Sequence, residues 1–121
     1  WLKQAHILCA VATSTFTNVA IGYLKNAGVL NCFAAIVGGD QVSRSKPDPE
    51  NFQLAMRALG KQTPETCLVF EDSRNGLLAG ANGGFPVIVV PDLFDPTLEL
   101  PGLCYAKCAR LDEAIDVIQN S

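Results

Sequence analysis

Apolar residues along the chain fall into two alternating patterns: short continuous runs, and longer stretches with helical spacing. Runs of this kind, bounded by turn-forming residues, are typical of buried strands, whereas apolar residues at i, i+3 and i+4 are typical of helices that bury one face. The runs predict strands over 7–12, 33–37, 67–70 and 86–90; the helical spacing and the start signals predict helices over 16–27, 49–59, 75–82 and 111–119.

Turn-forming residues set the boundaries of these elements. Gly28 and Gly60 end the first two helices, and Asp48 followed by Pro49 predicts an N-cap and a first helical residue. The tail over 91–101 is predicted to be a loop. Because strands and helices alternate at intervals suited to βαβ units, the chain is predicted to form a parallel, Rossmann-like α/β sheet with helices on both faces.

The composition restricts the class of protein. A length of 121 residues with 49% hydrophobic residues indicates one globular domain over 1–121. A net charge of −3 gives no basic surface for nucleic acid, and no apolar run approaches the length of a membrane helix. Five cysteines without a C-x-x-C pair favour free thiols and a reducing cytoplasm, with a disulfide or metal role for Cys104 and Cys108 as the alternative.

Three predicted strand ends carry polar residues that suit phosphoryl chemistry. Thr13 and Ser14 follow the first strand, Lys46 lies in the loop after the second, and Glu71 and Asp72 follow the third. A hydroxyl and free N–H groups at a helix N-terminus bind phosphate, and adjacent carboxylates suit Mg²⁺. Each group also has a simpler interpretation as a helix cap or a solvated side chain. Because ligands bind at the carboxyl ends of parallel strands, we expect all five to line one pocket.

Three stretches resemble motifs two, three and four of the haloacid dehalogenase superfamily, in the E-D-S-x-x-G form of its β-phosphoglucomutase-like branch. The stretches are Thr13-Ser14, 45–49 and 69–73, with Gly76 where many relatives carry aspartate. The resemblance implies that Thr13 and Ser14 bind the phosphoryl group, that Lys46 bridges phosphate and nucleophile as a catalytic residue, and that Glu71 and Asp72 hold Mg²⁺. It also implies that the parent protein is a phosphatase or phosphomutase for a small phosphorylated metabolite, a sugar phosphate or nucleotide.

The first motif of that family, D-x-D-x-[TV] on an apolar strand, does not occur in this sequence. The stretch 92–95 has the wrong spacing and follows the wrong strand. In the family this motif supplies the aspartate that forms an aspartyl-phosphate, and the cap follows it. We therefore expect the chain to be a partial core domain, without the central first-motif strand and cap, and inactive alone. The alternative is a non-catalytic α/β binding or scaffolding domain.

In the family, the first-motif strand lies between the strand that ends at Thr13 and the strand that ends at Glu71. Without it, the edges of these two strands have no partner between them. Unpaired buried N–H and C=O groups cost on the order of 1–3 kcal/mol each, so we expect an empty slot to be unfavourable. We expect the two edges to pair directly; the alternative is insertion of a strand from the missing N-terminal segment or from another copy of the chain.

Overall fold

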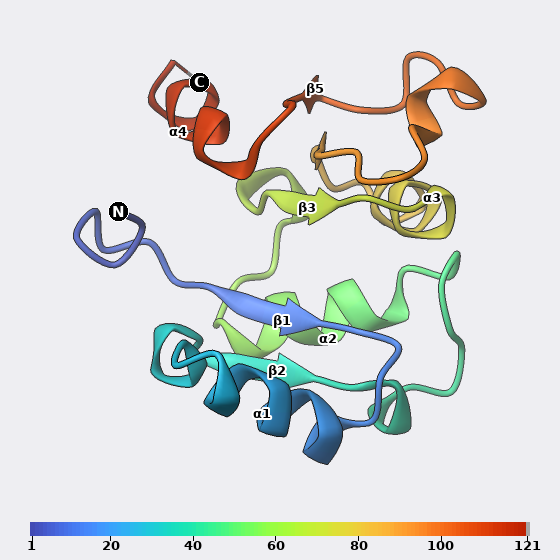
Figure 1. Ribbon diagram of the computed structural model, residues 1–121. Helices are drawn as coiled ribbons and strands as arrows, with labels where there is room; N and C mark the ends of the chain where they lie inside the picture. The colour runs from blue at the N-terminus through green and yellow to red at the C-terminus, as the bar shows by residue number, and fades with distance from the viewer. Residues whose placement is uncertain (121) are drawn as a thin grey trace.

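The computed structural model describes residues 1–120, and in them four α-helices surround two small parallel sheets (Figure 1). Within residues 1–120, none of the helices is long and apolar enough to cross a membrane. The strands are β1 (Ala10–Ala12), β2 (Ala35–Val37), β3 (Val69–Glu71), β4 (Val87–Val89) and β5 (Ala106–Lys107); the helices are α1 (Thr17–Asn26), α2 (Glu50–Ala58), α3 (Arg74–Asn82) and α4 (Ala114–Gln119).

The first sheet contains β1 and β2, which run parallel with Val11 opposite Ile36. In Figure 1, α1 lies in front of this sheet and α2 behind it. The helix α1 buries Ala20, and α2 buries Phe52 and Met56. Both faces of the first sheet are therefore covered, as the alternation of strands and helices predicts.

The second sheet has the order β3–β4–β5, again parallel. Its central strand β4 is fully buried, since Val87, Ile88 and Val89 have no exposed surface. Val87 and Val89 pack with Leu77 of α3, whereas Ile88 packs with Ala114 of α4 on the other face. An apolar run without alternation is what a strand covered on both faces requires.

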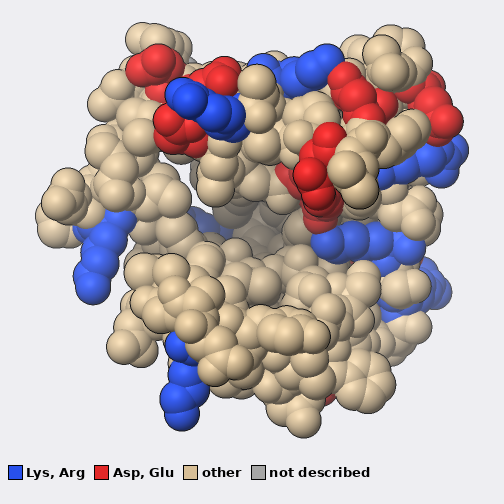
Figure 2. All heavy atoms as spheres, viewed as in Figure 1, with Lys and Arg blue, Asp and Glu red and all other residues tan. Residues whose placement is uncertain are grey.

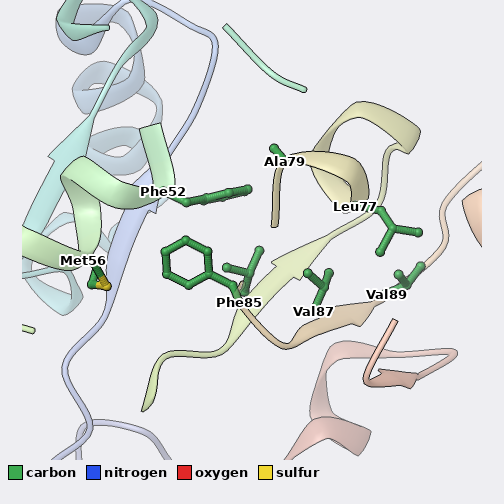
Figure 3. Close-up of a cluster of buried hydrophobic side chains, with 8 residues drawn as sticks. Phe52, Met56, Leu77, Ala79, Phe85, Val87 and Val89 are labelled. Atoms are coloured by element: carbon green, nitrogen blue, oxygen red, sulfur yellow. The ribbon is translucent and has the colours of Figure 1, made fainter. Parts of the chain in front are cut away.

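A cluster of apolar side chains joins the two sheets (Figure 3). Phe52 and Met56 reach from α2 to Val69 of β3 and to Phe85, the residue two positions before β4. The Phe52 and Phe85 rings meet edge to face, with centroids 6.1 Å apart, a favourable arrangement for aromatic pairs. The two sheets are therefore held together by side chains of α2, and no strand of one sheet pairs with a strand of the other among the described residues.

The predicted strands and helices all exist, with shifted ends, and the α/β fold class is confirmed. The helix α2 begins one residue later than predicted: Pro49 precedes it, and the Asp48 carboxylate accepts a hydrogen bond from the Glu50 N–H at 3.0 Å. The strand β5 was not predicted, because two residues carry too little hydrophobic pattern to identify. The cysteines are free thiols, and Cys108 packs as a small hydrophobe with Ile88.

The prediction that the two inner edges pair directly is wrong. Among the described residues β1 pairs only with the strand β2, and β3 pairs only with the strand β4, so the edges of β1 and β3 face each other without strand pairing (Figure 1). The prediction treated these edges as buried. In the structure Ala10–Ala12 and Phe70 are only partly buried, so water can satisfy their backbone groups at much lower cost. Insertion of a foreign strand stays a prediction.

Candidate functional site

A cavity of about 580 Å³ opens at the carboxyl ends of β1 and β3. Figure 2 shows the molecule hollowed between its two halves. The structure brings together all five residues predicted from the sequence, along with three from the start of α3. The lining residues are Thr13, Ser14, Lys46, Glu71, Asp72, Ser73, Arg74 and Asn75.

The loop after β1 presents hydroxyl and N–H groups to this cavity. The Thr13 N–H continues the ladder to the Val37 carbonyl at 2.9 Å, and the Thr13 hydroxyl accepts from the Thr15 N–H at 3.1 Å. The Ser14 N–H donates to no protein group within residues 1–120. An N–H group without an acceptor, on a residue that lines a cavity, is suited to an anion.

Lys46 spans the gap between the two sheets. Its Nζ donates to the Ala12 carbonyl at the end of β1 at 3.3 Å and to Glu71 Oε1 at the end of β3 at 2.5 Å. The Lys46 side chain is 12% exposed and that of Glu71 10%, so the ion pair is largely shielded from water. The ammonium also lies 4.7 Å from the centre of the Phe52 ring, a cation–π contact. These contacts therefore fix the cation in the wall of the cavity.

Glu71 reaches its position because residue 76 is glycine. The carboxylate lies over the first turn of α3, where Ser73 Oγ donates to Glu71 Oε2 at 3.3 Å and accepts from the Gly76 N–H at 3.0 Å. A Cβ on Gly76 would lie 2.0 Å from Glu71 Cδ. The carboxylate of Glu71 thus occupies the space that a side chain at position 76 would need. This contact links Glu71 and Gly76, the first and last positions of the E-D-S-x-x-G motif, and it could not be inferred from the sequence alone.

Asp72 is the carboxylate best placed to bind a cation. It is exposed at the cavity, and its side chain has no ion pair or hydrogen bond to the described residues. The described residues contain no cluster of three or more potential metal-ligating side chains. Two neighbouring carboxylates nevertheless fit Mg²⁺, which binds through one or two carboxylates and keeps several waters.

Sequence reasoning missed Arg74 and Asn75, which line the cavity from the first turn of α3. The signal was present, since a helix that begins directly after a strand directs its free N–H groups to the same edge of the sheet. Ser73 caps α3, because its hydroxyl accepts a hydrogen bond from the Gly76 N–H. Arg74 also pairs with Glu99 at 3.3 Å, on an exposed surface.

The family that matches this chain and two of its curated relatives are hydrolases or phosphatases. The sequence profile of haloacid dehalogenase-like hydrolases matches residues 1–84. The chain is 42% identical over 93 residues to a bifunctional riboflavin kinase/FMN phosphatase of Arabidopsis thaliana, covering 76% of the chain and 24% of that protein. It is 38% identical over 84 residues to a phosphorylated carbohydrates phosphatase of Thermotoga maritima, covering 69% of the chain and 38% of the relative. The chain thus spans less than half the length of these curated relatives.

Solved structures agree with this result. A candidate β-phosphoglucomutase from Thermotoga maritima superposes with a TM-score of 0.85 at 32% identity, covering 98% of the chain and 55% of that structure. CbbY from Rhodobacter sphaeroides, solved in complex with phosphate, superposes with a TM-score of 0.82 at 32% identity, covering 93% of the chain and 51% of that structure. The chain belongs to the haloacid dehalogenase-like hydrolases and resembles their β-phosphoglucomutase-like phosphatases.

Proposed function

We propose that this chain forms the phosphate-binding and Mg²⁺-binding side of a phosphatase or phosphomutase site. The observation that carries the proposal is the position of Lys46, whose ammonium lies between the end of β1 at Ala12 and the acidic end of β3 at Glu71. A fixed cation in a shielded site stabilises charge that develops on phosphoryl oxygens. Thr13 and Ser14 would bind the phosphoryl group through hydroxyl and N–H donors, on the same cavity as Lys46.

Asp72, with Glu71 beside it, would hold Mg²⁺. The ion would neutralise charge on the phosphoryl oxygens when bound. Asp72 has its carboxylate free for this task, whereas Glu71 is engaged by Lys46 and Ser73. We therefore expect Asp72 to contribute most of the affinity for the metal and Glu71 to orient Lys46.

The nucleophile is the part that this chain does not supply under the proposal. Both oxygens of Glu71 are hydrogen-bonded, and Asp72 is assigned to the metal. The D-x-D-x-[TV] strand of the family would fit between the unpaired edges of β1 and β3, parallel to both. Its aspartate would then enter the cavity beside Lys46. The whole protein would catalyse the reaction, and the 121-residue chain alone would not.

The substrate class follows from the relatives. Their names include an FMN phosphatase, a phosphorylated carbohydrates phosphatase and a fructose-1-phosphate phosphatase. We infer a small phosphorylated metabolite of this kind, a sugar phosphate or nucleotide, with no nucleic acid or membrane as partner. The free thiols of the structure suit a reducing compartment, and we propose the cytoplasm.

Titration of the isotopically labelled chain with inorganic phosphate, with and without Mg²⁺, tests the binding proposal by NMR. We expect the amides of Ser14 and Asn75 to shift in a saturable manner. The Lys46→Met variant should lose most of this binding, and Lys107→Met, which removes a lysine on β5 outside the cavity lining, should keep it. Saturable shifts only outside the cavity, or equal binding by Lys46→Met, would refute the proposal and favour a non-catalytic domain.

A further inference from the structure

The N-terminus of α1 is capped by a residue from a distant loop. Phe16 occupies the N-cap position of α1 and provides no side-chain cap, and the first turn of α1 contains no acidic residue. Asp40, 23 residues further along the chain, accepts hydrogen bonds at Oδ1 from both the N–H and the hydroxyl of Thr17, each at 2.7 Å. These bonds lower the pKa of Asp40, so it stays ionised.

The loop that carries Asp40 also presses against the loop that carries Thr13 and Ser14. The Gly39 N–H donates to the Thr15 carbonyl at 2.8 Å. A Cβ on Gly39 would lie 2.2 Å from the carbonyl oxygen of Ser14, a backbone atom that cannot move aside cheaply. The backbone around Ser14 is therefore positioned by contacts with the loop that follows β2.

Gln41 anchors the same contact to the sheet. Its side-chain amide donates to the Thr17 hydroxyl at 2.7 Å and to the Ile36 carbonyl at 3.1 Å. The Thr17 hydroxyl thus donates to Asp40 and accepts from Gln41, which fixes its orientation. Three consecutive residues, 39–41, connect β2 to the backbone between Ser14 and Thr17.

From these contacts we propose that Asp40 is a positioning residue for phosphate binding, which holds the Ser14 and Thr15 backbone in the orientation that receives a phosphoryl group. This inference rests on the proposed function, because it assumes that phosphate binds at the Ser14 N–H. Asp40 does not line the cavity, so it acts through Thr17 and the loop.

The sign of the effect separates positioning from simple electrostatics. Asp40 carries a negative charge near the N-terminus of α1, so removal of that charge alone should strengthen the binding of an anion. A positioning role predicts the opposite, because the loop loses its support when Thr17 is released. A misplaced Ser14 backbone would lose one charge-assisted hydrogen bond to phosphate, and this loss weakens the affinity about tenfold.

Phosphate titration of Asp40→Ala, followed at the Ser14 and Thr15 amides, tests the inference. We expect affinity about tenfold weaker than wild type. Asp40→Asn, whose side-chain carbonyl can still accept from Thr17, should recover most of the affinity. Asp116→Ala, which removes an exposed charge from α4, is the matched control and should bind as wild type does.

Binding by Asp40→Ala that is equal to or tighter than wild type would overturn the inference. If Asp40→Ala does not fold, a second pair of variants tests the same contact. Thr17→Ser keeps the hydroxyl that binds Asp40 and should bind phosphate as wild type does, whereas Thr17→Val lacks the hydroxyl and should bind more weakly. Equal affinities of the two variants would overturn the inference. Absence of any phosphate binding by the wild-type chain would instead refute the proposed function, and this inference with it.

Discussion

The ion pair between Lys46 and Glu71 supports a quantitative prediction about stability. Substitution Lys46→Met keeps the length and most of the apolar stem of the side chain but removes the ammonium. The Glu71 carboxylate, 10% exposed, then loses the partner at 2.5 Å, and the Ala12 carbonyl loses the donor at 3.3 Å. Removal of one partner from a buried pair costs about 3–5 kcal/mol.

Water in the adjacent cavity can solvate part of the Glu71 carboxylate that Lys46→Met leaves unpaired. We therefore expect a loss of unfolding free energy at the low end of that range, about 3 kcal/mol. A domain of this size has a total stability of about 5–15 kcal/mol, so Lys46→Met should still fold at 25 °C. Glu71→Gln should cost about the same, because it leaves the ammonium without its counter-charge. The double variant buries no charge at this position, and should lose much less than the sum of the two single losses.

Urea unfolding followed by far-UV circular dichroism gives the four free energies of this double-mutant cycle. We expect a coupling energy of about 2–3 kcal/mol between Lys46 and Glu71. The pair of Lys107 with Asp95 is a matched control, since it has the same 2.5 Å separation but its lysine is 49% exposed. That pair should show a much weaker coupling, because exposed ion pairs are screened by water. Additive effects at Lys46 and Glu71 would show that water screens this pair as fully as it screens a surface pair.

Three further results are expected. Gly76→Ala should displace the Glu71 carboxylate, because the new Cβ would lie 2.0 Å from Glu71 Cδ. Phosphate titration of this variant should show weaker binding than wild type. Wild-type affinity would show that phosphate binding does not depend on the position of the Glu71 carboxylate. Mg²⁺ should bind the chain weakly, because Glu71 and Asp72 are the only carboxylates among the described residues that line the cavity. Micromolar affinity in calorimetry would contradict this prediction. Equal binding by the double variant Glu71→Ala, Asp72→Ala would contradict it as well. Lys107 and Thr97 lower the pKa of Asp95 from 3.8 to about 2, so the stabilisation from this group is complete above pH 4 and is lost as the pH falls towards 2. Lys107→Met should therefore flatten this part of the acid-unfolding profile. An unchanged profile would show that Lys107 does not lower the pKa of Asp95.

Sequence patterns were sufficient for the parts of the fold that depend on local hydrophobic spacing. The continuous apolar run that becomes β4 and the glycine after α2 fix the strand and the end of the helix without reference to the rest of the chain. The predicted site residues also meet, because parallel strands bring their carboxyl ends to one edge. The fold class and the meeting of these five residues at one edge of the sheets were therefore predictable from the order and pattern of the chain.

Features that depend on tertiary contacts were not predictable. The strand β5 consists of Ala106 and Lys107, whose pairing with β4 is set by the sheet and not by their own pattern. The unpaired edges of β1 and β3 depend on the packing of the whole chain, in which Phe52 of α2 joins the apolar cluster that contains Val69 of β3. The contact of Gly76 with the Glu71 side chain is visible only in three dimensions.

Under the proposed function, this chain contributes the phosphate and metal side of a phosphatase site but no nucleophile. Hydrolysis of 4-nitrophenyl phosphate in the presence of Mg²⁺ provides the test, on the chain alone and on the chain fused behind a strand and cap that carry the family's first motif. We predict that the chain alone shows no more turnover than its Asp72→Ala variant, and that the fusion is active and loses activity with Lys46→Met. Turnover by the chain alone above the Asp72→Ala control, or activity of the fusion that survives Lys46→Met, would contradict the account.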